Sequence, residues 1–109
     1  MSLKEKLQED WKTALKAKNK FKANTISMAK AAVLQMEKTN GSKLDDEQII
    51  EVLAKEVKQR RDAMQEFKNG NRQDLVEQNE REIEILLNYL PRQLTKEEIM
   101  EIVQETAAA

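Results

Sequence analysis

Apolar residues recur every three or four positions in four stretches of the chain. Short polar segments separate these stretches at 18–20, 39–42 and 69–71. The spacing places the apolar side chains of each stretch on one face of an α-helix. Because the connecting segments are short, consecutive helices should run antiparallel to each other. The pattern therefore predicts an all-α fold built as an antiparallel helical bundle of four helices.

Three of the predicted helices begin at a residue whose side chain can accept a hydrogen bond from the first turn. Ser2 stands at the start of the first helix, and Asn71 at the start of the fourth. Asp45 opens the third helix, and Gln48 follows three positions later, which is the pattern of a capping box. These residues predict where the helices start.

The only proline, Pro91, follows the run from Ile85 to Leu90. A proline disfavours the helical conformation of the residue before it and lacks the amide hydrogen that a helix interior needs. The fourth helix should therefore stop near Leu90. Thr95 begins a further capping-box pattern, which predicts a fifth helix. Tyr89, Leu90 and Pro91 are thus expected to form a rigid elbow.

Composition narrows the possible chemistry. The chain of 109 residues has no cysteine and no histidine, which excludes a thiolate zinc site and removes the commonest acid–base group. Ser27 and Lys30 match the Ser-x-x-Lys pattern of acyl-transfer enzymes, but the companion motifs are missing, so chance explains the match better. Three acidic residues at 45–47 complement a helix dipole better than they form a metal site. We expect no catalytic residue, no metal and no cofactor.

No apolar run approaches the ~20 residues that a transmembrane helix needs, and the first residues show no signal-peptide pattern. A cytoplasmic location without membrane contact is the expectation. Charge is unevenly distributed, although its sum is only −1. Residues 1–22 hold seven lysines and three acidic residues, a net charge of +4, whereas residues 72–109 hold four basic and nine acidic residues, a net charge of −5. Either the basic end faces a polyanion or the basic first helix lies beside the acidic fourth helix, and we favour the second.

The third predicted helix carries two groups of charged residues. Arg60 falls within the apolar stripe, and Glu56 lies one turn before it in the favourable orientation for an ion pair. This charged pair is expected to be structural, with Arg60 reaching Glu56 or an acid of the fourth helix. Lys55, Lys58 and Arg61 lie three positions apart on a ridge away from the stripe, and they are the candidates for RNA binding.

Three segments resemble the motifs of one protein family. Residues 55–63 (KEVKQRRDA) are similar to its K-x-x-K-Q-R-x-[DE]-[SA] pattern. Residues 66–76 (EFKNGNRQDLV) and 82–94 (EIEILLNYLPRQL) resemble its next two motifs, in the same order. Residues 1–18 are similar to its opening segment. On these motifs the chain is identified as a member of the GatB/YqeY-like family.

The resemblance implies an all-α protein related to the tail of the amidotransferase B subunit, which helps engage tRNA during transamidation. Free-standing members are classed by likeness as carbon–nitrogen ligases that use glutamine as amide donor. Members continue into a second small helical domain. We therefore expect a helical body at 1–90, and at 91–109 the elbow and the start of that second domain, truncated here.

Three functions stay open from the sequence. The first is an accessory module linked to tRNA, to an amidotransferase or to an aminoacyl-tRNA synthetase complex, and it requires exposed cations for phosphate groups. The second is a protein–protein interaction bundle without RNA contact, which an isoelectric point near 5.6 favours. The third is an enzyme in its own right, for which the chain offers no visible nucleophile and base. The oligomeric state is not predicted.

Overall fold

The computed structural model describes residues 2–91, and all of its regular structure in this range is α-helical. The four helices are α1 (Leu3–Lys16), α2 (Lys20–Asn40), α3 (Asp46–Asn69) and α4 (Gln73–Leu87). No strand occurs between residues 2 and 91. The all-α class is therefore confirmed, whereas the predicted fifth helix lies outside the described residues.

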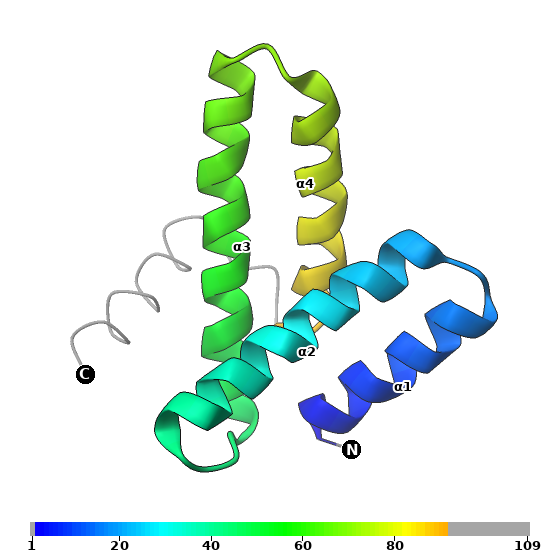
Figure 1. Cartoon of the computed structure of the whole chain (residues 1–109), viewed down its shortest axis with the longest axis vertical. Helices are drawn as coiled ribbons and strands as arrows, with labels where there is room; N and C mark the ends of the chain where they lie inside the picture. The colour runs from blue at the N-terminus through cyan, green and yellow to red at the C-terminus, as the bar shows by residue number, and fades with distance from the viewer. Residues whose placement is uncertain (1, 92–109) are drawn as a thin grey trace.

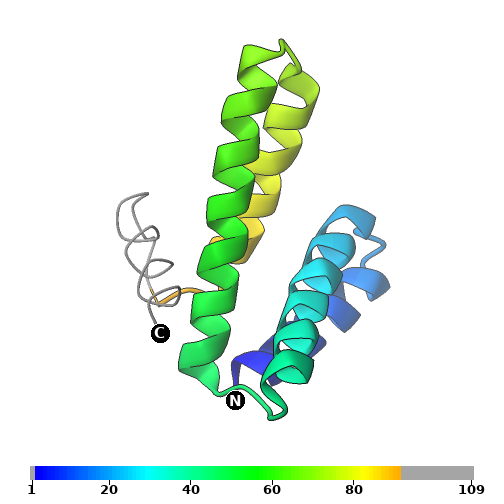
Figure 2. The same ribbon diagram turned by 60° about the vertical axis from the view of Figure 1, so that its left-hand side comes forward.

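The helices form two antiparallel hairpins, α1–α2 and α3–α4 (Figure 1). The hairpins do not lie along one common axis. Instead, α2 runs obliquely past the lower parts of α3 and α4, and it packs against both (Figures 1 and 2). The short polar turns do produce antiparallel neighbours within each hairpin. A single bundle of four aligned helices is not confirmed, because the connection between α2 and α3 turns the second hairpin across the first.

Two of the three predicted caps are confirmed. The Ser2 hydroxyl accepts a hydrogen bond from the Glu5 amide, and Asp45 and Gln48 form the complete capping box. The prediction for Asn71 was wrong. The residue before α4 is Arg72, which makes no side-chain cap, while Asn71 adopts the left-handed conformation with φ 59°. Asparagine tolerates this conformation, so it serves the turn instead of the cap.

The core lies where the two hairpins cross. Apolar residues of all four helices meet there, and Leu7, Ile26, Leu53, Val57 and Leu86 are almost fully buried. Each such side chain contributes about 1.5–3 kcal/mol through its removal from water. The apolar stripes predicted for the helices thus face one shared core.

The elbow is packed onto this core. Helix α4 ends at Leu87, and two backbone hydrogen bonds close the turn that follows, from Tyr89 N to Leu86 O and from Leu90 N to Leu87 O, both 3.1 Å long. Tyr89 and Leu90 are buried, whereas Pro91 is exposed. The residues beyond Pro91, and with them the expected second domain, lie outside the described range.

The expected neutralisation of the basic first helix by the acidic fourth helix was wrong. Within the described residues α1 packs against α2 and α3, and no packing contact joins it to α4. The reason is the crossing of the hairpins, which places α2 between α1 and α4. Packing against α4 therefore does not explain the positive charge of residues 1–22.

Candidate functional site

The basic ridge predicted on α3 lies on the surface, and its three cations differ in their surroundings. The side chain of Lys58 forms an ion pair with Asp62, with an Nζ–Oδ2 distance of 2.7 Å. Lys55 is exposed and Arg61 is half-buried. Neither Lys55 nor Arg61 forms an ion pair with another residue in the 2–91 range. Lys55 and Arg61 are therefore available to bind an anion. Lys58 is available as well, because its exposed i, i+4 pair with Asp62 contributes little to stability.

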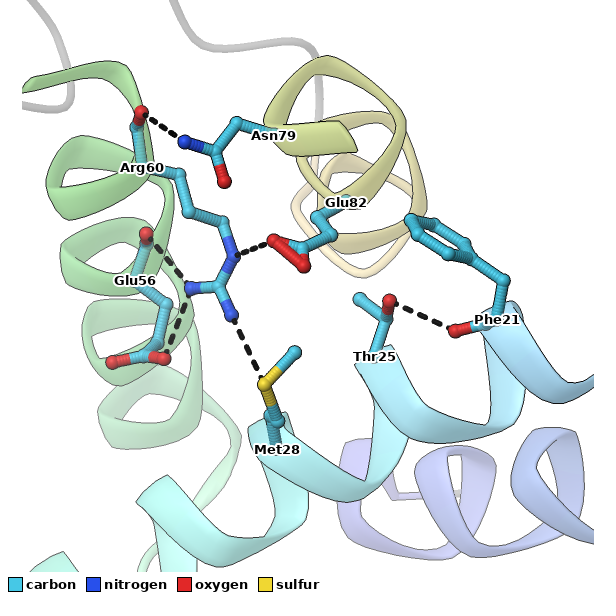
Figure 3. A network of polar contacts seen from close by, with 7 residues as sticks. All are labelled: Phe21, Thr25, Met28, Glu56, Arg60, Asn79 and Glu82. Atoms are coloured by element: carbon cyan, nitrogen blue, oxygen red, sulfur yellow. Dashed lines mark hydrogen bonds and ion pairs between the residues drawn. The ribbon is translucent and has the colours of Figure 1, made fainter. Parts of the chain in front are cut away.

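Behind the ridge, Arg60 points inward to the place where α2, α3 and α4 meet (Figure 3). Its Nε atom lies 3.3 Å from Glu82 Oε1, and its Nη1 atom lies 3.1 Å from Glu56 Oε1. The Nη1 atom also donates to the backbone carbonyl of Glu56 over 3.2 Å. The Arg60 side chain is 13% exposed and that of Glu82 only 8%. One guanidinium thus joins two carboxylates from two helices.

The groups around this arginine complete the junction. Nη2 of Arg60 faces the Met28 sulfur from α2 at 3.9 Å, and the Asn79 side chain donates to the Arg60 carbonyl at 3.5 Å. The buried hydroxyl of Thr25 donates to the Phe21 carbonyl (Figure 3). Every buried side-chain nitrogen or oxygen between residues 2 and 91 has a hydrogen-bond partner. A fully paired polar cluster of this kind fixes the relative position of the helices.

The sequence pointed to Glu56 or to an acid of the fourth helix as the partner of Arg60, and the structure contains both ion pairs. It did not identify Glu82 or Asn79 individually. Both lie on the face of α4 that turns toward Arg60, one and two turns after Leu75. Asn79 and Glu82 follow Val76 at steps of three, so both lie on or beside the apolar face of the helix. Two polar residues in such a position are the sequence signal that could have identified them as partners of Arg60.

Tyr89 of the elbow is fastened to α1. Its hydroxyl donates to Asp10 Oδ2 over 2.6 Å, and the Lys6 ammonium lies 5.4 Å from the centre of its ring. Burial and the neighbouring Asp10 carboxylate raise the pKa of the Tyr89 hydroxyl above its ordinary value. A protonated tyrosine at this place holds the turn after α4 against the first helix.

A groove of about 630 Å3 runs between α1 and α2. Its apolar lining includes Leu7, Val33 and Leu34, and Leu34 is 51% exposed. Ser27 and Lys30 also line it, but they form no acyl-transfer pair. The Lys30 ammonium donates to the Gln8 side chain and lies 4.2 Å from the centre of the Trp11 ring.

Two of the three acidic residues at the start of α3 have structural partners. Asp45 caps the helix through the Gln48 amide, and Asp46 Oδ1 accepts from the Leu3 amide over 3.1 Å. No cluster of three or more potential metal ligands occurs in the part of the chain that the structure describes. None of the four helices is long and apolar enough to cross a membrane.

Comparison with known proteins gives a consistent family match. The family model described as "Yqey-like protein" matches residues 4–109. A protein of Lachancea thermotolerans named "Altered inheritance of mitochondria protein 41, mitochondrial" is 38% identical over 85 residues, which cover 77% of this chain and 46% of that protein. The protein of the same name from Pyrenophora tritici-repentis is 32% identical over 84 residues, again 77% of this chain and 46% of the relative.

The protein of that name from Kluyveromyces lactis is 37% identical over 84 residues, which cover 76% of this chain and 45% of the relative. The chain thus spans about half the length of these curated relatives. Their names place those fungal proteins in mitochondria and state no reaction or partner. The cytoplasmic location of this chain stays a prediction.

Proposed function

Because this chain belongs to the YqeY-like family, we propose that it is an accessory helical module that binds tRNA rather than a catalyst. The proposal assigns the chain a place beside an amidotransferase or an aminoacyl-tRNA synthetase, as the resemblance to the amidotransferase tail implies. It assigns no catalytic residue and no cofactor. The carbon–nitrogen ligase class would then describe the partner enzyme and not this chain.

The observation that carries the proposal is the presence on α3 of cations that no residue of the 2–91 range neutralises through an ion pair. Lys55 and Arg61 have no ion pair within residues 2–91, while Arg60 next to them is fully engaged in the junction. Neutralisation of phosphate groups by such free cations is the main source of sequence-independent affinity for nucleic acids. Arg61 can donate two parallel hydrogen bonds to one phosphate, whereas the lysines act as point charges.

The test is the affinity of the chain for bulk tRNA at several salt concentrations, measured by fluorescence anisotropy. The wild-type chain should bind weakly, and its affinity should fall steeply as salt rises. A ridge variant with Lys55→Ala, Lys58→Ala and Arg61→Ala should flatten the slope of log affinity against log salt by about two to three, since each lost phosphate contact removes about 0.7–0.9.

The matched control removes three exposed lysines elsewhere, Lys38→Ala, Lys43→Ala and Lys68→Ala, so that the net charge changes equally. This control should bind tRNA more tightly than the ridge variant. Absence of any salt-dependent binding by the wild-type chain would refute the proposed function. Equal slopes for the ridge variant and the control would refute the role of the ridge alone.

A protein-interaction module is the second candidate, and the groove between α1 and α2 favours it. An apolar groove with an exposed leucine at its rim fits an amphipathic helix of a partner. In that case Leu34→Glu would abolish association with the amidotransferase, measured by co-sedimentation, and would leave tRNA affinity unchanged. Association that survives Leu34→Glu would exclude this groove as the contact.

A further inference from the structure

Five lysines gather where α1 ends and α2 begins, and we call this surface the lysine turn. Its members are Lys12, Lys16, Lys18, Lys20 and Lys22. No acidic residue occurs in the sequence between Trp11 and Met36. Four of the five lysines are exposed, and Lys22 is half-buried. The turn lies at the free corner of the α1–α2 hairpin, away from α3 (Figures 1 and 2).

The backbone under the lysine turn is held by a tight set of hydrogen bonds. Lys18 donates to the Leu15 carbonyl over 3.1 Å, and Asn19 donates to the Ala14 carbonyl over 2.9 Å. Asn19 then caps α2 by accepting from the Lys22 amide. Lys18 itself has φ 60°, a left-handed conformation that is uncommon for residues other than glycine. The lysines are therefore presented by an ordered connection and not by a loose loop.

No acidic side chain of residues 2–91 forms an ion pair with any of these five lysines. Of the acids that flank the segment, Asp10 accepts a hydrogen bond from Tyr89 and Glu37 pairs with Lys4. Helix α4, the acidic one, lies on the other side of α2 and does not contact α1.

Helix α4 instead adds a further cation. The Arg81 guanidinium stacks 4.3 Å from the centre of the Phe21 ring, in the first turn of α2. Like charges held close together oppose folding, so the arrangement costs stability as long as no anion is bound. Repulsion among like charges that no acidic side chain of residues 2–91 offsets through an ion pair is typical of a functional surface.

We infer that the lysine turn is the principal contact of this chain with the phosphate backbone of RNA. The inference rests on the proposed function and names the surface that performs it. An anionic membrane is the competing polyanion, but a peripheral membrane helix also needs a broad apolar face between its cations. Leu15 is the one large apolar side chain exposed within residues 11–22, so attraction here is electrostatic, as a nucleic-acid backbone requires.

The experiment compares tRNA affinity at several salt concentrations for the wild-type chain and a turn variant. The turn variant carries Lys12→Gln, Lys16→Gln, Lys18→Gln and Lys20→Gln. A matched control carries Lys38→Gln, Lys43→Gln, Lys68→Gln and Arg72→Gln, which are exposed, lie outside both the ridge and the lysine turn, and remove the same charge. Far-UV circular dichroism and thermal unfolding verify that both variants fold. The salt slope of the turn variant should flatten by about three to four, and its affinity in low salt should fall at least tenfold below the control.

Three results would overturn the inference. If the wild-type chain binds tRNA and the turn variant binds as tightly as the control, the lysine turn is not the contact, although the proposed function stands. If the wild-type chain shows no affinity for tRNA, the proposed function fails together with the inference. If vesicles of two-thirds phosphatidylcholine and one-third phosphatidylserine bind through the same lysines while tRNA does not, the surface recognises a membrane.

Discussion

Replacement of Arg60 is the sharpest test of how the helices are held together. In Arg60→Met the apolar part of the side chain stays, while the guanidinium and its bonds to Glu56 and Glu82 are lost. The carboxylate of Glu82, 8% exposed, would then remain buried without its cation. Removal of one partner from a buried ion pair typically costs 3–5 kcal/mol. Because Glu56 is 21% exposed and water can reach it, we take the lower end, about 3 kcal/mol.

The assay is urea unfolding followed by circular dichroism. A loss of about 3 kcal/mol lowers the midpoint by about 1–3 M, because the urea dependence of the unfolding free energy is about 1–3 kcal/mol per molar for small domains. The double variant Arg60→Met with Glu82→Gln should recover part of the loss, since it no longer buries an unpaired charge. Arg72→Met is the matched control, because it breaks the exposed pair with Asp74 and should leave the midpoint nearly unchanged. An Arg60→Met midpoint equal to that of the control would refute the junction as a source of stability.

Two further predictions concern pH. Tyr89→Phe removes the hydrogen bond to Asp10 and should cost about 1–2 kcal/mol at neutral pH. Because the pKa of Tyr89 is raised in the folded state, the contribution of its hydroxyl to stability is complete below the ordinary pKa of about 10 and declines as the pH rises above it. Urea midpoints of the two proteins, measured from pH 9 to 12, should therefore converge. The pKa of Glu37 is lowered, first by its hydrogen bond with Lys4 and then by that with the Leu44 amide, so this carboxylate stabilises the fold above its ordinary pKa and ceases to do so as the pH falls. Glu37→Gln should therefore have a lower urea midpoint than the wild type at pH 7 and the same midpoint at pH 3, and a difference that persists at pH 3 would contradict this origin.

The helices and their faces could be read from the sequence because they depend on local periodicity. Ile49, Leu53 and Val57 recur at the helical spacing of four along α3 and are indeed buried, and the capping box predicted at Asp45 is present. Asn71 shows that the sequence does not always identify the residue that caps a helix. It lies one residue too early to cap α4, and the choice between a cap and a left-handed turn depends on how the two helices must face each other.

The crossing of the hairpins could not be predicted from the sequence, since it depends on contacts between residues far apart in the chain. That crossing decides what the charged residues do. It brings Glu82 of α4 to Arg60, and it keeps α4 away from α1 and the lysines that α1 carries. The ridge at Lys55, Lys58 and Arg61 could be recognised in the sequence from its spacing. The lysine turn became a candidate binding surface only with the structure, which shows no ion pair between its lysines and any residue of the 2–91 range.

The measurement that tests the account most directly is a titration of the isotopically labelled chain with tRNA in low salt, followed by two-dimensional nitrogen–proton NMR. The account predicts progressive shifts of the amide signals of residues 12–22, smaller shifts around Lys55 and Arg61, and the disappearance of both in high salt. Signals of residues 12–22 that stay unchanged, while those lining the groove at Val33 and Leu34 shift, would contradict it.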